Sequence, residues 1–106
     1  MKMVYWNYLR IQTLITSFVM INAEREQIAS IPDALLKING VTEVYSVAGD
    51  FDLIAIVRVK AADDLAKVVT EDFAKIHGIS KTKTLIAFRC YTNYDLERMF
   101  QIGFKN

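Results

Sequence analysis

The chain has 106 residues, 53% of them hydrophobic, and a formal net charge of +1 from 13 basic and 12 acidic residues. This length suits one domain with a modest core. The balanced charge argues against nucleic-acid binding through a basic field, which needs a clustered excess of Lys and Arg. Cys90 is the only cysteine, so a disulfide framework and a cysteine-based metal site are excluded, and a reducing compartment is the default.

No segment predicts export or membrane insertion. The apolar run near the N-terminus is interrupted by Arg10 and Gln12, and no small-residue cleavage site follows it. The stretch 14–21 is far too short to span a bilayer. We therefore expect a cytoplasmic protein.

The first predicted elements are a strand from Leu14 to Asn22 and a helix that runs to about Ile38. Ser30 is the expected N-cap of this helix, because a serine hydroxyl can accept from the first free N–H groups. Pro32 and Asp33 then fall in the first turn, where a missing N–H is harmless and a carboxylate suits the helix dipole.

The segment from Val41 to Lys60 predicts two strands joined at Gly49 and Asp50. Gly followed by Asp between two strand-like runs is typical of a tight hairpin, because Gly supplies the positive φ that such turns need. The second arm is apolar at almost every position, with Arg58 its one charged member. A strand that is apolar on both sides does not suit a sheet with one side open to water.

A second helix is predicted from Asp63 to about Lys75, followed by Gly78. Its apolar residues recur at spacings of three and four, as in an amphipathic helix: Leu65, Val68, Val69, Phe73 and Ile76. The last strand is predicted over residues 80–90, and a short amphipathic tail helix over residues 94–102.

The chain also follows a duplicated plan. Residues 13–50 and 51–88 align at an offset of 38, most clearly where Lys37–Thr42 lies over Lys75–Ser80. In both copies a helical segment is followed by Gly and an extended segment, and a Gly just past a helix end is expected in the left-handed conformation of the C′ position. Each half therefore predicts β-α-β.

Together the halves predict an α+β fold, the ferredoxin-like βαββαβ arrangement of a four-stranded antiparallel sheet with two helices on one face. In the strand that begins near Phe51, Ile54 and Ile56 point away from Leu53, Ala55 and Val57, so both sides of the sheet are apolar. The first strand does the same, with Phe18 and Met20 opposite Val19 and Ile21. Two helices can cover only one of these sides. An exposed patch of this kind is rare in soluble monomers, and at about 25 cal/mol per Å² its burial is worth on the order of 10 kcal/mol before association costs. We expect a homodimer, a dimeric α/β-barrel with facing sheets, since twofold symmetry is the commonest arrangement.

The sequence offers no catalytic constellation. It has one histidine, no Gly-rich phosphate loop and no nucleophile elbow. His77 is best explained as a helix C-terminal residue, and Cys90 as a small half-buried side chain. The carboxylate pairs Asp63-Asp64 and Glu71-Asp72 are best explained as solvated helix charges. No catalytic residue, metal site or cofactor is predicted.

Two polar features are candidates for a ligand site. One is Gly49-Asp50-Phe51-Asp52, and the other is the pair of hydroxyls on Thr82 and Thr84. An amino-acid ligand needs N–H donors for its carboxylate and an acidic partner for its ammonium group, which a hairpin loop with an Asp can supply. Turn chemistry explains Gly49 and Asp50 fully, and Thr is simply a good strand residue. Both interpretations stay open on composition alone.

The order of these features resembles a known module. The runs KINGVTEVYSVAGDFDLIAIVRV (37–59) and KIHGISKTKTLI (75–86) closely resemble the effector-binding RAM domain of the Lrp/AsnC, or feast/famine, transcription regulators. The resemblance covers residues 14–90. It implies dimers through facing sheets, rings of dimers such as an octamer, and amino acids bound near dimer–dimer contacts. It also implies a ligand-binding set of Gly49, Asp50, Phe51, Asp52, Thr82 and Thr84.

The chain departs from full-length regulators at its N-terminus. These carry a helix-turn-helix before the domain, whereas only thirteen residues precede the first strand here. We expect a stand-alone form with an N-terminal arm (1–13), the domain (14–90) and a tail (91–106). The arm's Tyr5, Trp6 and Tyr8 suit either a neighbouring subunit or a private core contact.

These interpretations predict a module that senses a small amino acid and modulates transcription by assembling with a DNA-binding Lrp/AsnC paralogue, without itself contacting nucleic acid or membrane. Two alternatives stay open. One is a purely structural oligomeric partner without ligand. The other is a small dimeric ferredoxin-like enzyme, which the position of the only histidine makes less attractive.

Overall fold

The computed structural model describes residues 13–93. The strands and helices follow in the order β1 (Ile15–Ala23), α2 (Ile31–Leu36), β2 (Val41–Ser46), β3 (Leu53–Val59), α3 (Ala62–Lys67) and β4 (Ile79–Ile86). The predicted arm, apart from Thr13, and the predicted tail helix lie outside the described residues. None of the helices in residues 13–93 is long and apolar enough to cross a membrane.

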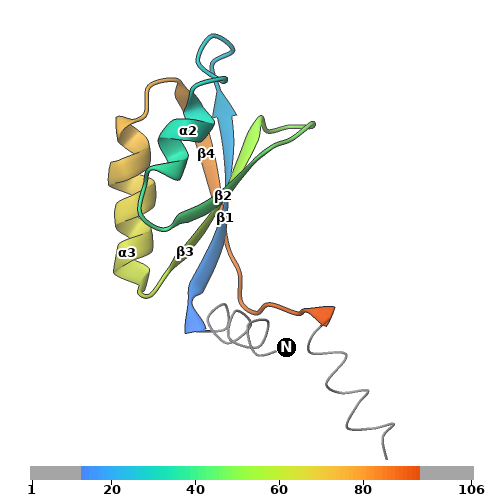
Figure 1. The fold of residues 1–106 in the computed structure, drawn as a ribbon, viewed down its shortest axis with the longest axis vertical. Coiled ribbons are helices and arrows are strands. Elements are labelled where there is room, and N and C mark those ends of the chain that lie inside the picture. Colours follow the sequence, from blue (N-terminus) through green and yellow to red (C-terminus); the bar gives the residue numbers. More distant parts are fainter. Residues whose placement is uncertain (1–12, 94–106) are drawn as a thin grey trace, which may run out of the picture.

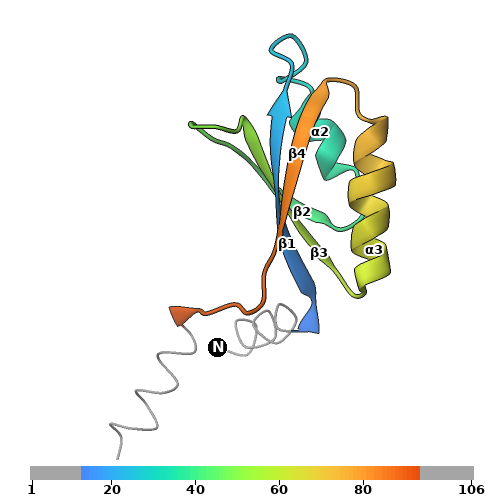
Figure 2. The same cartoon turned by 180° about the vertical axis from the view of Figure 1, so that it is seen from behind.

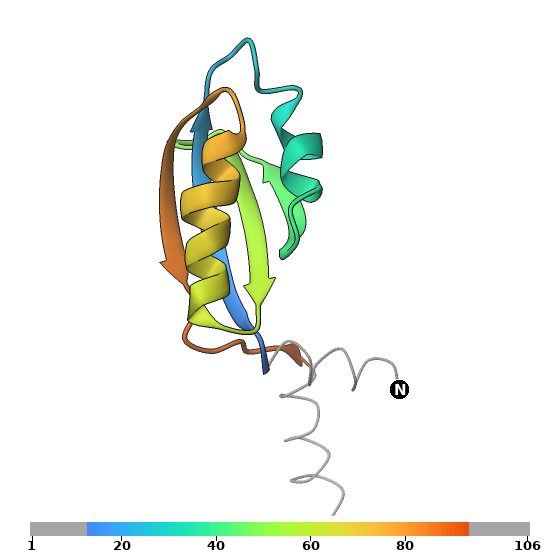
Figure 3. The same ribbon diagram turned by 90° about the vertical axis from the view of Figure 1, so that its left-hand side faces the viewer.

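The four strands form one antiparallel sheet in the order β2-β3-β1-β4. Both helices lie on the same side of it, with α2 near β2 and α3 running along the sheet (Figures 1 and 3). The predicted ferredoxin-like βαββαβ fold is thus confirmed. The two strands that are most apolar in sequence, β1 and β3, lie in the middle of the sheet.

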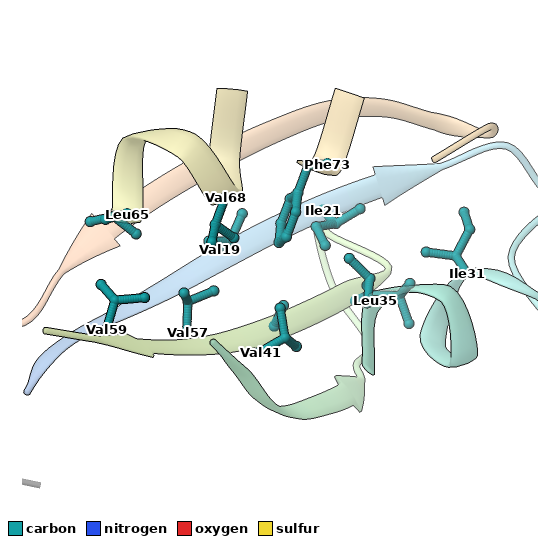
Figure 4. Close-up of a cluster of buried hydrophobic side chains, with 12 residues drawn as sticks. Val19, Ile21, Ile31, Leu35, Val41, Val57, Val59, Leu65, Val68 and Phe73 are labelled. Carbon is teal, nitrogen blue, oxygen red and sulfur yellow. The ribbon is translucent and has the colours of Figure 1, made fainter. Parts of the chain in front are cut away.

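The core fills the space between the helices and the sheet (Figure 4). It draws on alternate residues of the central strands and on the inner faces of both helices: Val19, Ile21, Ile31, Leu35, Val41, Leu53, Ala55, Val57, Val59, Leu65, Val68 and Phe73. The residues between them on the strands point the other way. This second side of the sheet, here named the open face, carries Phe18, Met20, Glu43, Tyr45, Ile54, Ile56, Arg58, Lys83 and Leu85.

The first helix begins as predicted but is not capped as predicted. Ser30 occupies the N-cap position with helical dihedral angles (φ −93°, ψ −18°) and makes no side-chain capping bond. Its Oγ donates to the carbonyl of Gln27 at 2.9 Å instead. The preceding turn already leads the chain into the helix, so the hydroxyl faces back toward that turn. The helix ends at Leu36, two residues before Ile38.

The second helix covers the predicted length with an irregular second half. After Lys67 it widens into a π-helical turn (Val68–Asp72) and closes with a 3₁₀ turn (Phe73–Lys75). Thr70 Oγ1 donates to the carbonyl of Ala66 at 2.6 Å within this region. A hydroxyl that bonds back to a carbonyl in the preceding turn commonly distorts a helix.

The duplicated glycines have the same backbone conformation. Gly40 and Gly78 both have φ +102°, which confirms the predicted positive φ. Neither is the C′ residue, because the helices end at C-caps Lys37 and Ile76, so each glycine sits one or two positions further along. At Gly78 a Cβ would also meet the Cβ of Gln27 at 2.3 Å, so close packing adds to the conformational demand.

The last strand ends at Ile86, short of the predicted Cys90. Among the described strands its only neighbour is β1, which begins at Ile15, so there is little strand left to pair with residues 87–90. One more backbone bond, from Ala87 N–H to Thr16 O at 2.8 Å, follows the strand. The chain then turns away from the helices (Figures 1 and 2).

Candidate functional site

The loop between β2 and β3 carries most of the predicted ligand-binding residues. The tight two-residue turn predicted at Gly49 and Asp50 is wrong: Ser46 pairs with Leu53, so six residues (47–52) make the connection. Val47 N–H donates to the carbonyl of Asp52 at 3.0 Å and closes the loop. Gly49 has φ +130°, which is the glycine conformation that the sequence predicted for this turn.

Asp52 connects this loop to the central strand β1 through two hydrogen bonds. Its N–H donates to the carbonyl of Ile21 at 2.9 Å, and its Oδ2 accepts from the N–H of Ala23 at 2.9 Å. The β1–β3 register ends at the pair Ile21–Leu53, so Ala23 lies beyond it and its N–H bonds to the loop instead of a strand. The predicted ligand residue Asp52 therefore also has a structural contact.

The tip of the loop is accessible and has polar groups to offer. Gly49 and Asp50 are exposed, and Phe51 and Asp52 are half-buried. Within the described residues, no hydrogen bond involves the N–H groups of residues 49–51. A carboxylate accepts about four hydrogen bonds, so Asp52 retains capacity beyond its bond to Ala23. The loop thus combines free N–H donors with two carboxylates.

The two threonines lie on β4, which is separated by β1 from the strands that carry the loop. Thr82 pairs with Ile21 and Thr84 with Val19, so both hydroxyls share the helix-covered side of the sheet and are half-buried. Thr82 is next to the residue whose carbonyl accepts from Asp52, whereas Thr84 is further along β4. The strand β1 separates both from the two strands that carry the loop.

The other chemistry-bearing residues stand apart. His77 is exposed in the turn before β4, and Cys90 is half-buried in the segment after it. Across residues 13–93, no group of three or more His, Cys, Asp or Glu side chains is placed to hold a metal ion.

A polar cluster on the open face was not predicted. Arg58 Nη1 donates to Thr42 Oγ1 at 2.7 Å and lies 3.5 Å from Glu43 Oε1. The Tyr45 hydroxyl donates to Glu43 Oε2. This hydrogen bond, together with the negative charge of Glu43, raises the pKa of Tyr45. The signal in the sequence was Arg58 itself, a single charge in an apolar strand.

Two hollows adjoin Arg58. The larger, of about 550 Å³, lies toward α3 and has charges of both signs on its walls, among them Lys60, Asp64 and Lys67. The smaller, of about 160 Å³, lies on the open face where residues 87–90 pass the start of β1. Neither includes the loop 47–52 among its lining residues.

The chain matches the model of a known protein family over most of its length. The family model described as the Lrp/AsnC ligand binding domain matches residues 16–95. The chain belongs to the Lrp/AsnC family. This is a family of transcription regulators, and the loop 47–52 lies inside the domain that its description calls ligand-binding.

Similar Lrp/AsnC proteins include longer regulators and short ones. The chain is 32% identical over 85 residues to an uncharacterized HTH-type transcriptional regulator of Pyrococcus furiosus, covering 77% of this chain and 57% of that protein. It thus spans little more than half the length of this curated relative. The protein TTHA0845 of Thermus thermophilus is 40% identical with a TM-score of 0.69, over 74% of this chain and 98% of that one.

A more distant structure shares the fold alone. A transcriptional regulator from Neisseria meningitidis, solved as a complex with L-Met, has a TM-score of 0.69 at 9% identity, over 81% of this chain and 56% of that one. The sheet and its two helices therefore persist where most side chains differ.

Proposed function

We propose that this Lrp/AsnC domain senses a small amino acid and modulates transcription by assembling, as a cytoplasmic dimer or ring of dimers, with DNA-binding relatives. The loop 47–52 and the threonines of β4, Thr82 and Thr84, form its ligand site. The observation that carries the proposal is the loop: exposed N–H donors and two carboxylates within the family's ligand-binding domain.

The loop's chemistry suits both ends of an amino acid. The N–H groups of residues 49–51 can donate to a ligand carboxylate, and Asp50 can pair with the ammonium group. Asp52 holds the loop in place through Ala23 and has further acceptor capacity. The neighbour with the same fold that was solved with L-Met supports an amino acid as the ligand class.

The open face supports assembly. Phe18, Tyr45 and Leu85 are 39%, 52% and 46% exposed on it, and they border the half-buried Met20 and Ile54. A second copy that packs its own open face here would cover these side chains.

Co-assembly with a DNA-binding relative is supported by the greater length of the related regulators. The Pyrococcus furiosus regulator is named for an HTH segment, and its length beyond this match leaves room for one. A shared ligand-binding domain gives two such chains matching surfaces. Ligand would then act by favouring one assembly over another, which requires different affinity for the two states.

The direct test is calorimetry with each of the twenty amino acids, together with light-scattering mass measurement with and without the ligand found. We expect one or a few amino acids to bind and Asp50→Asn to weaken binding about tenfold or more, because an ionic hydrogen bond is lost. Asp33→Asn, an exposed carboxylate on α2, is the matched control and should change nothing. Failure of all twenty to bind would refute the sensor and leave a ligand-free structural partner.

Co-assembly is tested by mixing the chain with a DNA-binding Lrp/AsnC paralogue from the same genome. Mixed oligomers by native mass spectrometry, and an altered gel-shift pattern on the paralogue's DNA, are expected. Separate homo-oligomers in the presence and absence of ligand would refute this part of the proposal.

A further inference from the structure

Two neighbouring rows of side chains cross the open face, and both are apolar in the middle. The strand register places Glu43, Ile56, Phe18 and Leu85 in one row, and Tyr45, Ile54, Met20 and Lys83 in the next. The middle positions come from the central strands β3 and β1. The ends of the rows lie on the outer strands of the described sheet, where β2 contributes polar residues and β4 contributes Leu85 and Lys83.

The two outer strands differ in charge on this face. On β2, the side chain of Glu43 is 44% exposed, and the exposed Tyr45 donates to its carboxylate. Arg58 lies 3.5 Å from this carboxylate and offsets part of its charge, but its own side chain is only 21% exposed. On β4, Lys81 and Lys83 are both exposed, and neither forms an ion pair within residues 13–93. The accessible charge is therefore acidic on β2 and basic on β4.

A second copy can cover the open face in two ways that keep the strands in line. The twofold axis lies between the facing sheets and runs either along the strands or across them. An axis along the strands reverses the strand order and keeps every row at its own height, so β2 of one copy lies opposite β4 of the other. An axis across the strands places β4 opposite β4 and β2 opposite β2.

Charge favours the axis along the strands. With the axis across them, Lys81 and Lys83 of both copies would gather at one edge, and like charges that face each other across an interface are destabilising. With the axis along them, these lysines lie opposite β2. The partner subunit's Lys83 then shares its row with Tyr45 and is one row, about 7 Å, from Glu43. Its long side chain can pair with the carboxylate and pack on the tyrosine ring.

The apolar middle of the rows does not discriminate between partners. With either axis, Phe18, Met20, Ile54 and Ile56 would face the same set of apolar side chains in the second copy. The hydrophobic effect is non-directional, so this contact would stabilise any chain with similar central strands. Discrimination between partners needs an element that is attractive for one chain and repulsive for another. On these two rows, the charged ends supply it.

We propose that Lys83 and the Glu43–Tyr45 pair select the partner of the open face. The partner subunit's Lys83 pairs with Glu43 and packs on the Tyr45 ring, and twofold symmetry repeats this contact at the other edge. The proposal rests on the proposed dimer and adds the contact that decides which chains can form it. A related chain is admitted when it offers a cation opposite β2 and an anion opposite β4, and it is rejected when the charges are alike.

The first test reverses one charge at a time. Lys83→Glu and Glu43→Lys each replace attraction by repulsion at both edges, so each should raise the dissociation constant of the dimer about tenfold or more. Analytical ultracentrifugation at constant ionic strength measures the constant. Lys75→Glu makes the same change at an exposed residue after α3, and it is the matched control that should stay within about twofold. Circular dichroism and thermal midpoints check that every variant is folded.

Combined variants assign the loss to this pair of charges. The double variant Glu43→Lys/Lys83→Glu exchanges cation and anion across each edge, so the dimer should recover to within about threefold of the unmodified chain. A mixture of the two single variants should form mixed dimers in excess of either homodimer, because each edge again joins opposite charges. Native mass spectrometry with one chain labelled with ¹⁵N counts the mixed dimers.

The results also separate the two axes. With β4 opposite β4, Lys83→Glu would not weaken its own homodimer, and it would form an excess of mixed dimers with the unmodified chain. Either result would overturn the proposal and leave the proposed dimer standing, as would a double variant as weak as the single ones. A monomeric unmodified chain would overturn the dimer itself, and this proposal with it. Because Lys83 is exposed and makes no ion pair within its own described chain, Lys83→Glu tests the interface even if Glu43→Lys does not fold.

Discussion

The two faces of the sheet are built from the same strands but differ in how far their side chains are buried. In β1, Val19 and Ile21 are fully buried beneath the helices, whereas Phe18 between them is 39% exposed on the open face. In β3, Leu53 and Val57 are buried on the helix side, whereas Arg58 anchors a polar cluster on the other. The covered face is completed by the chain itself. The open face has exposed apolar side chains that a further molecule can cover.

The largest expected effect is on the covered face. Leu53→Ala removes a side chain that is 1% exposed, and we expect it to lower the free energy of unfolding by about 2–5 kcal/mol through lost burial and a residual cavity. Urea denaturation at low protein concentration measures this. Leu85→Ala, at 46% exposure on the open face, is the control and should cost much less. Equal losses would mean that the two faces do not differ in packing.

A charge on the open face should break the proposed dimer. Phe18→Asp places a carboxylate on each copy at the centre of the facing sheets, and we expect the dissociation constant to rise about a hundredfold or more. Analytical ultracentrifugation measures the constant, and circular dichroism should show an unchanged fold. Leu36→Asp, which alters an exposed residue on the helix side, serves as the control. A dimer that survives Phe18→Asp would place the interface elsewhere.

Alanine substitutions at two glycines distinguish the cost of close packing from the cost of a positive φ. Gly78→Ala combines positive φ with a clash against Gln27, and we expect a loss of about 1–3 kcal/mol in unfolding free energy. Gly49→Ala at the loop tip also has positive φ but meets no atom within 4 Å, so its loss should be smaller. Thermal denaturation of both variants checks the order. The reverse order would show that the turn before β4 rearranges readily.

Substitution of Ser17, on the covered face, should change stability less than the substitutions above and in the opposite direction. Its side chain is fully buried, and its Oγ has no hydrogen-bond partner among the described residues. Ser17→Ala removes a desolvated hydroxyl, so we expect stability to rise by about 1 kcal/mol. Calorimetric melting measures the gain. A loss would indicate that the hydroxyl is satisfied in solution.

The smallest effect concerns Tyr45 on the open face. The hydrogen bond to Glu43 raises its pKa above the ordinary 10.0, so the phenol should ionise at higher pH than in an unfolded chain. The associated stabilisation is present below pH 10.0 and is lost as the pH rises through the folded-state pKa. Absorbance titration, with Tyr45→Phe to identify the signal, measures the pKa. Glu43→Gln should bring it back down, and an unchanged pKa in that variant would exclude the carboxylate as the cause.

The fold was predictable because local signals agreed with one another. The alternation in β1 and β3, the helical spacing from Leu65 to Phe73 and the paired glycines at 40 and 78 all specified the same βαββαβ order. Signals of this kind depend on neighbours in the sequence, which a single chain displays directly.

The details that were missed depend on geometry between distant residues. The end of β4 is set by where β1 begins, and the length of the loop 47–52 is set by the pairing of Ser46 with Leu53. Ser30 was expected to cap a helix and bonds to Gln27 instead, because the preceding turn fixes its dihedral angles. Of the candidate site, residues 49–52 were identifiable as a loop, but the bond from Asp52 to Ala23 and the cluster around Arg58 required the tertiary structure.

Because the Ala23 N–H donates to the Asp52 carboxylate, its amide proton can report on the position of the loop 47–52. This N–H is bonded to a side chain that belongs to the loop and not to a neighbouring strand. Its chemical shift and exchange rate will therefore follow the position of the Asp52 carboxylate, while the amides within β1 follow the sheet. A two-dimensional NMR spectrum can consequently distinguish a change at the loop 47–52 from a change elsewhere along β1.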